Sequence, residues 1–266
     1  MSATLITLAQ YGALAFGLSC LVAGVLLRLL HPKRFYFVRH GQSILNAERV
    51  RQGADGALSP KGREQAGEAG RFLAQFPIEA IIASPFERTR ETAAIIETFI
   101  RVPVSYSPLL VERRSPSEVI GRSYDEPAVA RISDIVDHAY HDDIFRYSDE
   151  ENFLDMRARA RDCLEMLRRE RAHEVCVVTH SFFLKMLIAY LLYRERLHAR
   201  DYVKLAFFNT ADNASVTICD YRPWERFSAT HGWRVIAFNL HAEAPPEQMA
   251  PAPQVEPVPF APNGRP

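Results

Sequence analysis

Strand-like and helix-like patterns alternate along most of this 266-residue chain, and this alternation limits the possible folds more than any other feature. Short apolar runs that are typical of buried strands occupy residues 34–38, 79–84, 174–179, 214–221 and 233–240. Helical patterns separate them at residues 60–75, 85–99, 152–171 and 182–193. The alternation predicts an α/β domain with three layers, α/β/α, in which helices cover both faces of a mostly parallel central sheet.

An apolar segment precedes this alternation. Residues 5–27 carry no charge, and a helix of that length crosses a hydrocarbon core about 30 Å thick. No basic side chain precedes the segment, as one would in a cleaved signal peptide, whereas Arg28, Lys33 and Arg34 follow it. Residues 1–33 are therefore predicted to be a transmembrane anchor with a basic flank. By the positive-inside rule, this single-pass membrane protein would keep its catalytic domain in the cytoplasm.

The C-terminal residues 245–266 are rich in proline and have no amphipathic period. Such a segment buries too little apolar area to offset its chain entropy, so we predict a disordered tail. A motif for a proline-binding partner domain is the alternative interpretation. Residues 34–244 remain as the folded domain.

Composition excludes some classes of function. The 32 basic and 32 acidic side chains cancel, so no overall field attracts nucleic acid, and we expect no nucleic-acid partner. The four cysteines contain no CxxC pair, which fits buried thiols better than a disulfide framework or a zinc site.

Polar residues follow three of the predicted strands. The first strand ends on Arg39 and His40, the second ends on Ser84 four residues before Arg88, and a later one ends on His180. Because ligands bind beyond the carboxyl ends of strands in parallel sheets, we expect these side chains to meet at one edge.

These residue types suit the cleavage of a phosphomonoester. The planar fork of an arginine binds two phosphate oxygens at once, and a neutral imidazole can attack phosphorus when a backbone carbonyl fixes its tautomer. Gly41 would leave room for the phosphate, and free N–H groups would face it from the helix that begins after His180. Taken singly, each histidine could equally be structural and Arg88 could be a solvated side chain.

At this point the sequence from about residue 34 to 240 resembles the histidine phosphatase superfamily, which includes cofactor-dependent phosphoglycerate mutases. The resemblance rests on a set of features in this order: Arg39-His40-Gly41 with Asn46, Gln52-Gly53, Leu58-Ser59 with Gly62, Gln65 and Ala66, the segment SPFERTRETA at residues 84–93, and His180.

The resemblance implies roles for individual residues. His40 would be the nucleophile that becomes phosphorylated, Arg39, Arg88 and His180 would bind the phosphate, and Glu112 would be the acid-base carboxylate. Asn46, Gly53 and Ser181 complete the predicted substrate-binding set. An ion pair with a nearby arginine is the alternative interpretation of Glu112.

The chain also departs from the mutases. A Tyr-Gly pair follows their carboxylate, whereas Arg113-Arg114-Ser115-Pro116 follows Glu112 here, and this favours net hydrolysis. Residues 113–151 are predicted to form a polar cap over the pocket. A metal site is one interpretation of the cap residues His138, His141, Asp142 and Asp143, but a solvated helix face is favoured. We expect no metal and no other cofactor.

The sequence therefore predicts a membrane-anchored phosphatase that hydrolyses phosphomonoesters through a phosphohistidine intermediate. Its substrate would be a phosphorylated small molecule or a phosphoprotein. Two alternatives stay open: a phosphoglycerate-type mutase, and a catalytically slow module that binds phosphoproteins.

Overall fold

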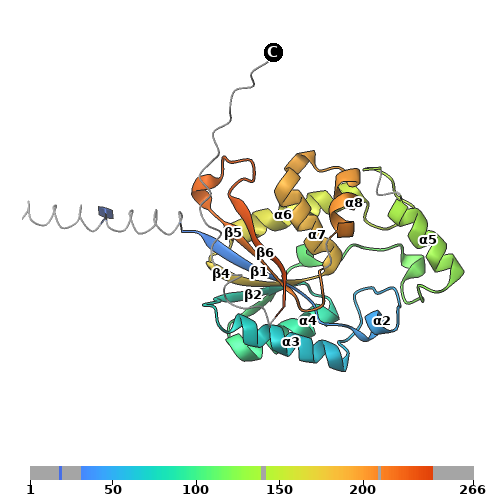
Figure 1. Cartoon of the computed structure of the whole chain (residues 1–266), viewed down its shortest axis with the longest axis horizontal. Coiled ribbons are helices and arrows are strands. Elements are labelled where there is room, and N and C mark those ends of the chain that lie inside the picture. Colours follow the sequence, from blue (N-terminus) through green and yellow to red (C-terminus); the bar gives the residue numbers. More distant parts are fainter. Residues whose placement is uncertain (1–17, 20–30, 139–141, 209–210, 242–266) are drawn as a thin grey trace, which may run out of the picture.

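A six-stranded sheet forms the centre of the molecule (Figure 1). This computed structural model describes residues 18–19, 31–138, 142–208 and 211–241. The strands lie in the order β3-β2-β4-β1-β5-β6, with bounds Val104–Tyr106, Ala80–Ala83, Glu174–Thr179, Lys33–Arg39, Val216–Tyr221 and Trp233–Leu240. The first four are parallel to one another, and β5 is antiparallel to both β1 and β6. The sheet is mixed, although only β5 runs against the other strands.

The side chains of β1 show why helices cover both faces. Phe35 and Phe37 pack into a core formed with α6 (Phe153–Arg169) and α7 (Ser181–Tyr193). Tyr36 and Val38 point the opposite way, into a core formed with α3 (Pro60–Leu73) and α4 (Glu87–Ile100). Because successive side chains of a strand alternate between faces, a continuous apolar run requires apolar cover on both sides. The predicted three layers are confirmed.

Local capping fixes where the predicted helices begin. The Ser59 hydroxyl accepts the N–H of Gly62 at 3.0 Å, and Pro60 occupies the first turn of α3. At α6, Asn152 and Asp155 form a reciprocal capping box. The chain also forms helices that sequence patterns did not predict: α2 (Ile44–Ala47), α5 (Pro127–His138) and α8 (Ala199–Phe208).

The segment predicted as a cap, residues 113–151, contains α5 and the 3₁₀ helix Ser117–Val119. It contacts the loop after β1, where the Arg51 N–H donates to the Arg122 carbonyl at 2.9 Å. It also returns toward α7 through Arg113, whose guanidinium lies 4.2 Å from the ring centroid of Phe182. Figure 1 shows α5 and α2 at the end of the molecule away from the start of β1.

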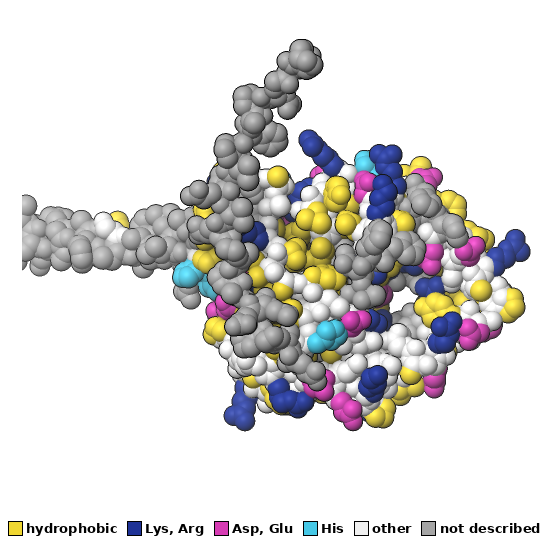
Figure 2. Space-filling model, viewed as in Figure 1, with side chains coloured by type: hydrophobic (Ala, Val, Ile, Leu, Met, Phe, Trp, Pro, Cys, Tyr) yellow, Lys and Arg dark blue, Asp and Glu magenta, His cyan; other side chains and the backbone are white. Residues whose placement is uncertain are grey.

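Two predicted segments lie outside the described residues: the apolar run, except for residues 18 and 19, and the proline-rich tail. In the part that is described, no helix combines the length and the apolar character needed to cross a bilayer. The anchor and the tail therefore stay predictions. On the face shown in Figure 2, basic and acidic side chains are interspersed, as the balanced composition implies.

Candidate active site

His40 lies at the carboxyl end of β1 and is only 4% exposed. Its Nδ1 atom is 2.7 Å from the Gly41 carbonyl oxygen. A carbonyl only accepts hydrogen bonds, so Nδ1 carries the ring proton and Nε2 presents a lone pair. Burial, together with the charges of Arg88 and Arg39, holds the pKa of His40 well below 6.5. The site therefore contains a neutral imidazole in the tautomer that a nucleophile requires.

His180 follows β4 and is completely buried. Its Nε2 lies 2.9 Å from the Ser84 hydroxyl, which also accepts the N–H of Phe86 at 3.3 Å. A proton donated by this hydroxyl to Nε2 places the ring proton on Nδ1, a buried atom with no hydrogen-bond partner among the described residues. Burial and the nearby Arg88 hold the pKa of His180 well below 6.5. In that tautomer the ring is a neutral donor whose N–H has no acceptor in the part of the chain that the structure describes.

Two arginines complete the group. Arg88 is 2% exposed and donates through Nη1 to the Gly53 carbonyl at 2.9 Å, while Arg39 donates through Nη1 to the Ala211 carbonyl at 2.6 Å. The Nε atoms of both arginines are buried, and neither has a hydrogen-bond partner among the residues described by the structure. Burial lowers the pKa of Arg88 to about 10, with Glu112 opposing the shift and Arg39 adding to it. Unpaired buried donors are costly unless a ligand satisfies them, so these atoms favour an anion site.

Glu112 lies beside these cations and caps helix α7. Its Oε2 accepts the N–H of Phe182 at 3.1 Å, and its Oε1 accepts those of Phe183 at 3.0 Å and Arg113 at 2.9 Å. We expected the N–H groups at the start of this helix to face the phosphate. For Phe182 and Phe183 that expectation is wrong, because a carboxylate of the protein already occupies them. The partners of Glu112 are amides, so the ion-pair interpretation does not describe these contacts.

The backbone around Gly41 leaves no room for a side chain, which is a constraint that the sequence did not suggest. A Cβ atom there would lie 2.3 Å from the carbonyl oxygen of Gly62, which is an impossible contact with backbone. The loop after β1 packs directly on the start of α3, where Gly62 is equally restricted by Gln42. Close backbone packing alone therefore requires glycine at position 41, and space for the phosphate stays a prediction.

The other predicted substrate-binding residues differ in how they contact the arginines and histidines of the site. The Gly53 carbonyl holds Arg88, and the Ser181 hydroxyl lies 3.5 Å from the Ala211 carbonyl that also accepts from Arg39. Asn46 is exposed, and its backbone and side chain form a capping box with Ser43. Direct substrate contact by Gly53, Ser181 and Asn46 stays a prediction.

Sequence patterns gave no role to three further residues that hold the site together. Ser84 orients His180, and the Asn213 amide donates to the His40 carbonyl at 3.0 Å. Arg159 on α6 donates to the Val111 carbonyl at 2.7 Å and pairs with Glu151 at 2.7 Å, which fixes the segment carrying Glu112. Only Ser84 had a signal in the sequence, as the end of a strand that leads to Arg88.

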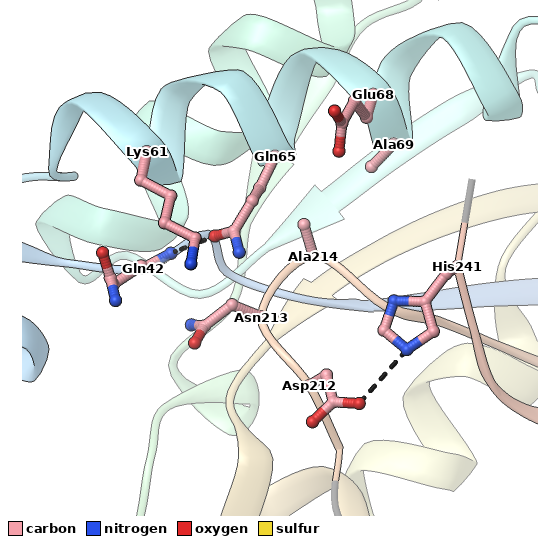
Figure 3. A pocket seen from close by; sticks show the side chains of 9 residues that line it. All are labelled: Gln42, Lys61, Gln65, Glu68, Ala69, Asp212, Asn213, Ala214 and His241. Carbon is pink, nitrogen blue, oxygen red and sulfur yellow. Dashed lines mark hydrogen bonds and ion pairs between the residues drawn. The ribbon is translucent and has the colours of Figure 1, made fainter. Parts of the chain in front are cut away.

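A polar cavity of about 430 Å³ adjoins the loop after β1 (Figure 3). Figure 3 shows Lys61 and Gln65 of α3 on one side and Asn213 and Asp212 on the other, with an ion pair between Asp212 and His241. Its lining contains neither the predicted nucleophile His40 nor any of the three groups predicted to bind the phosphate. We therefore assign it no part in the chemistry.

Comparison with known proteins agrees with this geometry. Residues 35–233 match the family model described as histidine phosphatase superfamily, branch 1. A broad-specificity phosphatase of Saccharomyces cerevisiae is 27% identical over 205 residues, which is 71% of this chain and 79% of that protein. A probable phosphoglycerate mutase of Erwinia tasmaniensis is 42% identical, over only 29% of this chain and 36% of its own.

Solved structures share the fold. A mycobacterial glucosyl-3-phosphoglycerate phosphatase superimposes with a TM-score of 0.61 at 24% identity, covering 79% of this chain and 99% of that one. A putative alpha-ribazole-5'-P phosphatase of Escherichia coli gives a TM-score of 0.63 at 19% identity, covering 78% and 96%. The family match spans most of the described domain and includes every group of the site. The chain therefore belongs to the histidine phosphatase superfamily, and we classify it as a phosphoric monoester hydrolase of that family.

Proposed function

We propose that this protein is a membrane-anchored phosphatase that hydrolyses phosphomonoesters through a phosphohistidine at His40. One observation carries the proposal: three buried donor atoms, Nε of Arg39, Nε of Arg88 and Nδ1 of His180, lack partners in the described part of the chain and lie beside a neutral His40. A phosphoryl group between them would accept from all three. Fixed donors of this kind stabilise charge that develops on the transferred group.

In the first step, Nε2 of His40 attacks the phosphorus atom in line with the bond to the leaving alkoxide. The N–P bond forms as the P–O bond breaks, and the carboxyl group of Glu112 gives its proton to the alkoxide. Each carboxylate oxygen has two lone-pair sites, so the amide contacts of Glu112 still leave capacity to hold that proton.

In the second step, water attacks the phosphohistidine and loses a proton to the carboxylate of Glu112. The N–P bond breaks, inorganic phosphate departs, and His40 returns to its starting form. The charge that a metal ion supplies in other phosphoryl-transfer enzymes would come here from Arg39 and Arg88, and His180 would add a neutral N–H donor.

Hydrolysis and phosphate shuttling differ in what happens to the phosphohistidine. The short match to a probable phosphoglycerate mutase supports shuttling as a second candidate. The match to a broad-specificity phosphatase covers much more of the chain, and the Tyr-Gly pair after Glu112 is missing. Both observations support hydrolysis. Stimulation by a bisphosphorylated sugar acid would instead favour the mutase.

Phosphate release from a panel of phosphorylated sugars, sugar acids and peptides tests the proposal. The full chain would be assayed in detergent with chelator, beside His40→Ala and the control His173→Ala, whose half-buried ring contacts the Pro32 carbonyl at the other end of the sheet. We expect wild type and the control to release phosphate and His40→Ala to release none. Equal rates for His40→Ala and wild type would overturn the assignment. Recovery of full-length chain from the soluble fraction of cells would overturn the anchor.

A further inference from the structure

The end of the sheet opposite the catalytic edge carries an unusual surface. At that end β1 begins at Lys33, which pairs with Tyr221 at the end of β5, and Tyr221 pairs with Trp233 at the start of β6. Residues 222–232 therefore lie beside the start of β1, as the orange loop next to the blue strand shows in Figure 1. Helix α7 starts at the catalytic edge and returns to this end, where Arg194 follows it.

Large apolar side chains are exposed at this end. Phe227 is 86% exposed and Trp224 51% exposed in the loop between β5 and β6. Leu192 and Tyr193, the last residues of α7, are 52% and 43% exposed. Single exposed apolar residues are ordinary, but several large ones at the same end of a sheet indicate an interaction surface.

The same surface is rich in arginine. A cavity of about 600 Å³ between α6 and the loop is lined by Arg161, Arg168, Arg194, Arg226 and His231. Arg161 and Arg168 pair with Asp162 and Glu165. Arg194 and Arg226 instead stack on Tyr190 and Phe227, and neither has a carboxylate partner within the described residues. The surface therefore keeps uncompensated positive charge beside exposed aromatic rings.

We propose that this surface, formed by residues 192–194, 222–232 and the arginines of the cavity, docks on an anionic lipid bilayer. Tryptophan, tyrosine and arginine are the side chains that suit the boundary between headgroups and acyl chains. Anionic lipids attract basic residues close to the membrane. An anionic bilayer thus matches both the apolar and the charged side chains of the surface.

The short connection between the anchor and β1 also favours the bilayer as the partner of this surface. This inference rests on the proposed anchor, whose apolar run ends at residue 27, six residues before β1. Six residues extend no more than about 20 Å, so the start of β1 must stay close to the membrane. The seven residues of β1 then place His40 about 20 Å farther away, at the edge facing water. Docking would hold the active site open toward soluble substrates.

The two tryptophans of the chain allow a direct test. Trp224 is half-exposed on the proposed surface, whereas Trp233 is 2% exposed and reports the protein interior. The full chain would be reconstituted into phosphatidylcholine vesicles with and without phosphatidylglycerol, with bromine on the acyl chains as a quencher. We expect bromine to quench the emission of wild type in the anionic vesicles, and Trp224→Phe to lose that quenching.

Charge variants test the electrostatic part. Each arginine near the surface changes the ratio of docked to undocked protein about fivefold, so Arg194→Gln with Arg226→Gln should lower it about 25-fold. The matched control is Arg131→Gln on α5, which is exposed on a different element. We expect the control to quench like wild type and the double variant to approach the value in neutral vesicles.

Three results would overturn the docking surface while leaving the anchor and the activity intact. These are no quenching of Trp224 in a chain that resists carbonate extraction, equal quenching in neutral and anionic vesicles, and emission that is blue-shifted yet insensitive to bromine. The last result would show that a second copy or another protein covers the face. Phosphate release measured in the same vesicles reports the proposed catalytic function separately, and its loss would leave the quenching result standing.

Discussion

The rings of His40 and His180 lie 5.1 Å apart, centroid to centroid, with an angle of 64° between their planes. Each ring has one nitrogen fixed by the protein: Nδ1 of His40 by the Gly41 carbonyl and Nε2 of His180 by the Ser84 hydroxyl. The remaining nitrogens differ: Nε2 of His40 presents a lone pair, whereas Nδ1 of His180 carries a proton. The two tautomers thus make one ring a nucleophile and the neighbouring ring an oxyanion donor.

Ser84→Ala tests that choice at His180. Without the hydroxyl, Nε2 loses its donor and the ring can place its proton on either nitrogen. Loss of one buried hydrogen bond is worth about 1–3 kcal/mol, so we expect kcat to fall about 10- to 100-fold while the fold is kept. Steady-state kinetics with circular dichroism check this. Unchanged kcat in a folded variant would contradict the role of Ser84, and Ser84→Thr, which retains a hydroxyl, should recover part of the rate.

Glu112 has two separable duties, capping α7 and transferring protons. Glu112→Gln keeps an acceptor oxygen for the amides of Phe182 and Phe183, whereas Glu112→Ala removes both oxygens. We expect both variants to lose at least about 100-fold in kcat. Glu112→Ala should in addition lower the free energy of unfolding by about 1–2 kcal/mol, the usual cost of a lost helix cap. Urea unfolding and initial rates separate the two effects, and a fully active Glu112→Gln would remove the proton-transfer role.

Gly41→Ala should be strongly destabilising, because its Cβ would lie 2.3 Å from the Gly62 carbonyl. We expect a loss of about 1–3 kcal/mol or more in the free energy of unfolding. Gly67→Ala in α3 is the matched control, since its nearest neighbour is the end of the Arg71 side chain at 3.8 Å. Replacing a helical glycine without a clash should stabilise by about 0.5–1 kcal/mol. Equal stabilities for the two variants would contradict the packing argument.

The buried histidines predict how stability depends on pH. Both have pKa values well below 6.5 when folded, mainly through burial, so the unfolded chain binds more protons just below pH 6.5. The free energy of unfolding should therefore fall as the pH drops below about 6.5, with a slope approaching 1.4 kcal/mol per pH unit for each histidine. Above that pH these groups contribute no slope. Urea unfolding at pH 5 to 8 checks this, and His180→Gln should roughly halve the slope.

Arg88→Gln should raise the pKa of His40, because it removes a positive charge that opposes protonation. The acidic limb of the kcat/KM profile, which reports the free enzyme, should then move to higher pH. Nitrogen chemical shifts of His40 measured across the same pH range give an independent value. A pKa of His40 that is unchanged in Arg88→Gln would show that the charge of Arg88 does not contribute to it.

Sequence patterns predicted the parts of the site that follow directly after buried strands. Apolar runs predict β1 and β4, and in a sheet where these strands are parallel the residues after them, His40 and His180, must share an edge. The packing of Gly41 on Gly62 was not predicted, because these residues are 21 positions apart and no periodicity relates them.

The remaining parts depend on contacts between distant segments. Strand β5 runs antiparallel, so its beginning rather than its end reaches the catalytic edge, and it brings Asn213 to the backbone of His40. Polar site residues were expected only after strand ends, so Asn213, which precedes β5, was not predicted. The capping of α7 by Glu112 joins residues 70 apart in the chain, a pairing that no spacing rule predicts.

Trapping of the phosphorylated intermediate tests the central claim most directly. Wild-type protein and His40→Ala would be mixed with radiolabelled phosphomonoester, quenched within milliseconds in base or acid, and digested for peptide mapping. The account predicts label on the peptide containing His40, stable in base and lost in acid, and none on His40→Ala. Label that survives acid, or label on another peptide, would contradict a phosphohistidine at His40.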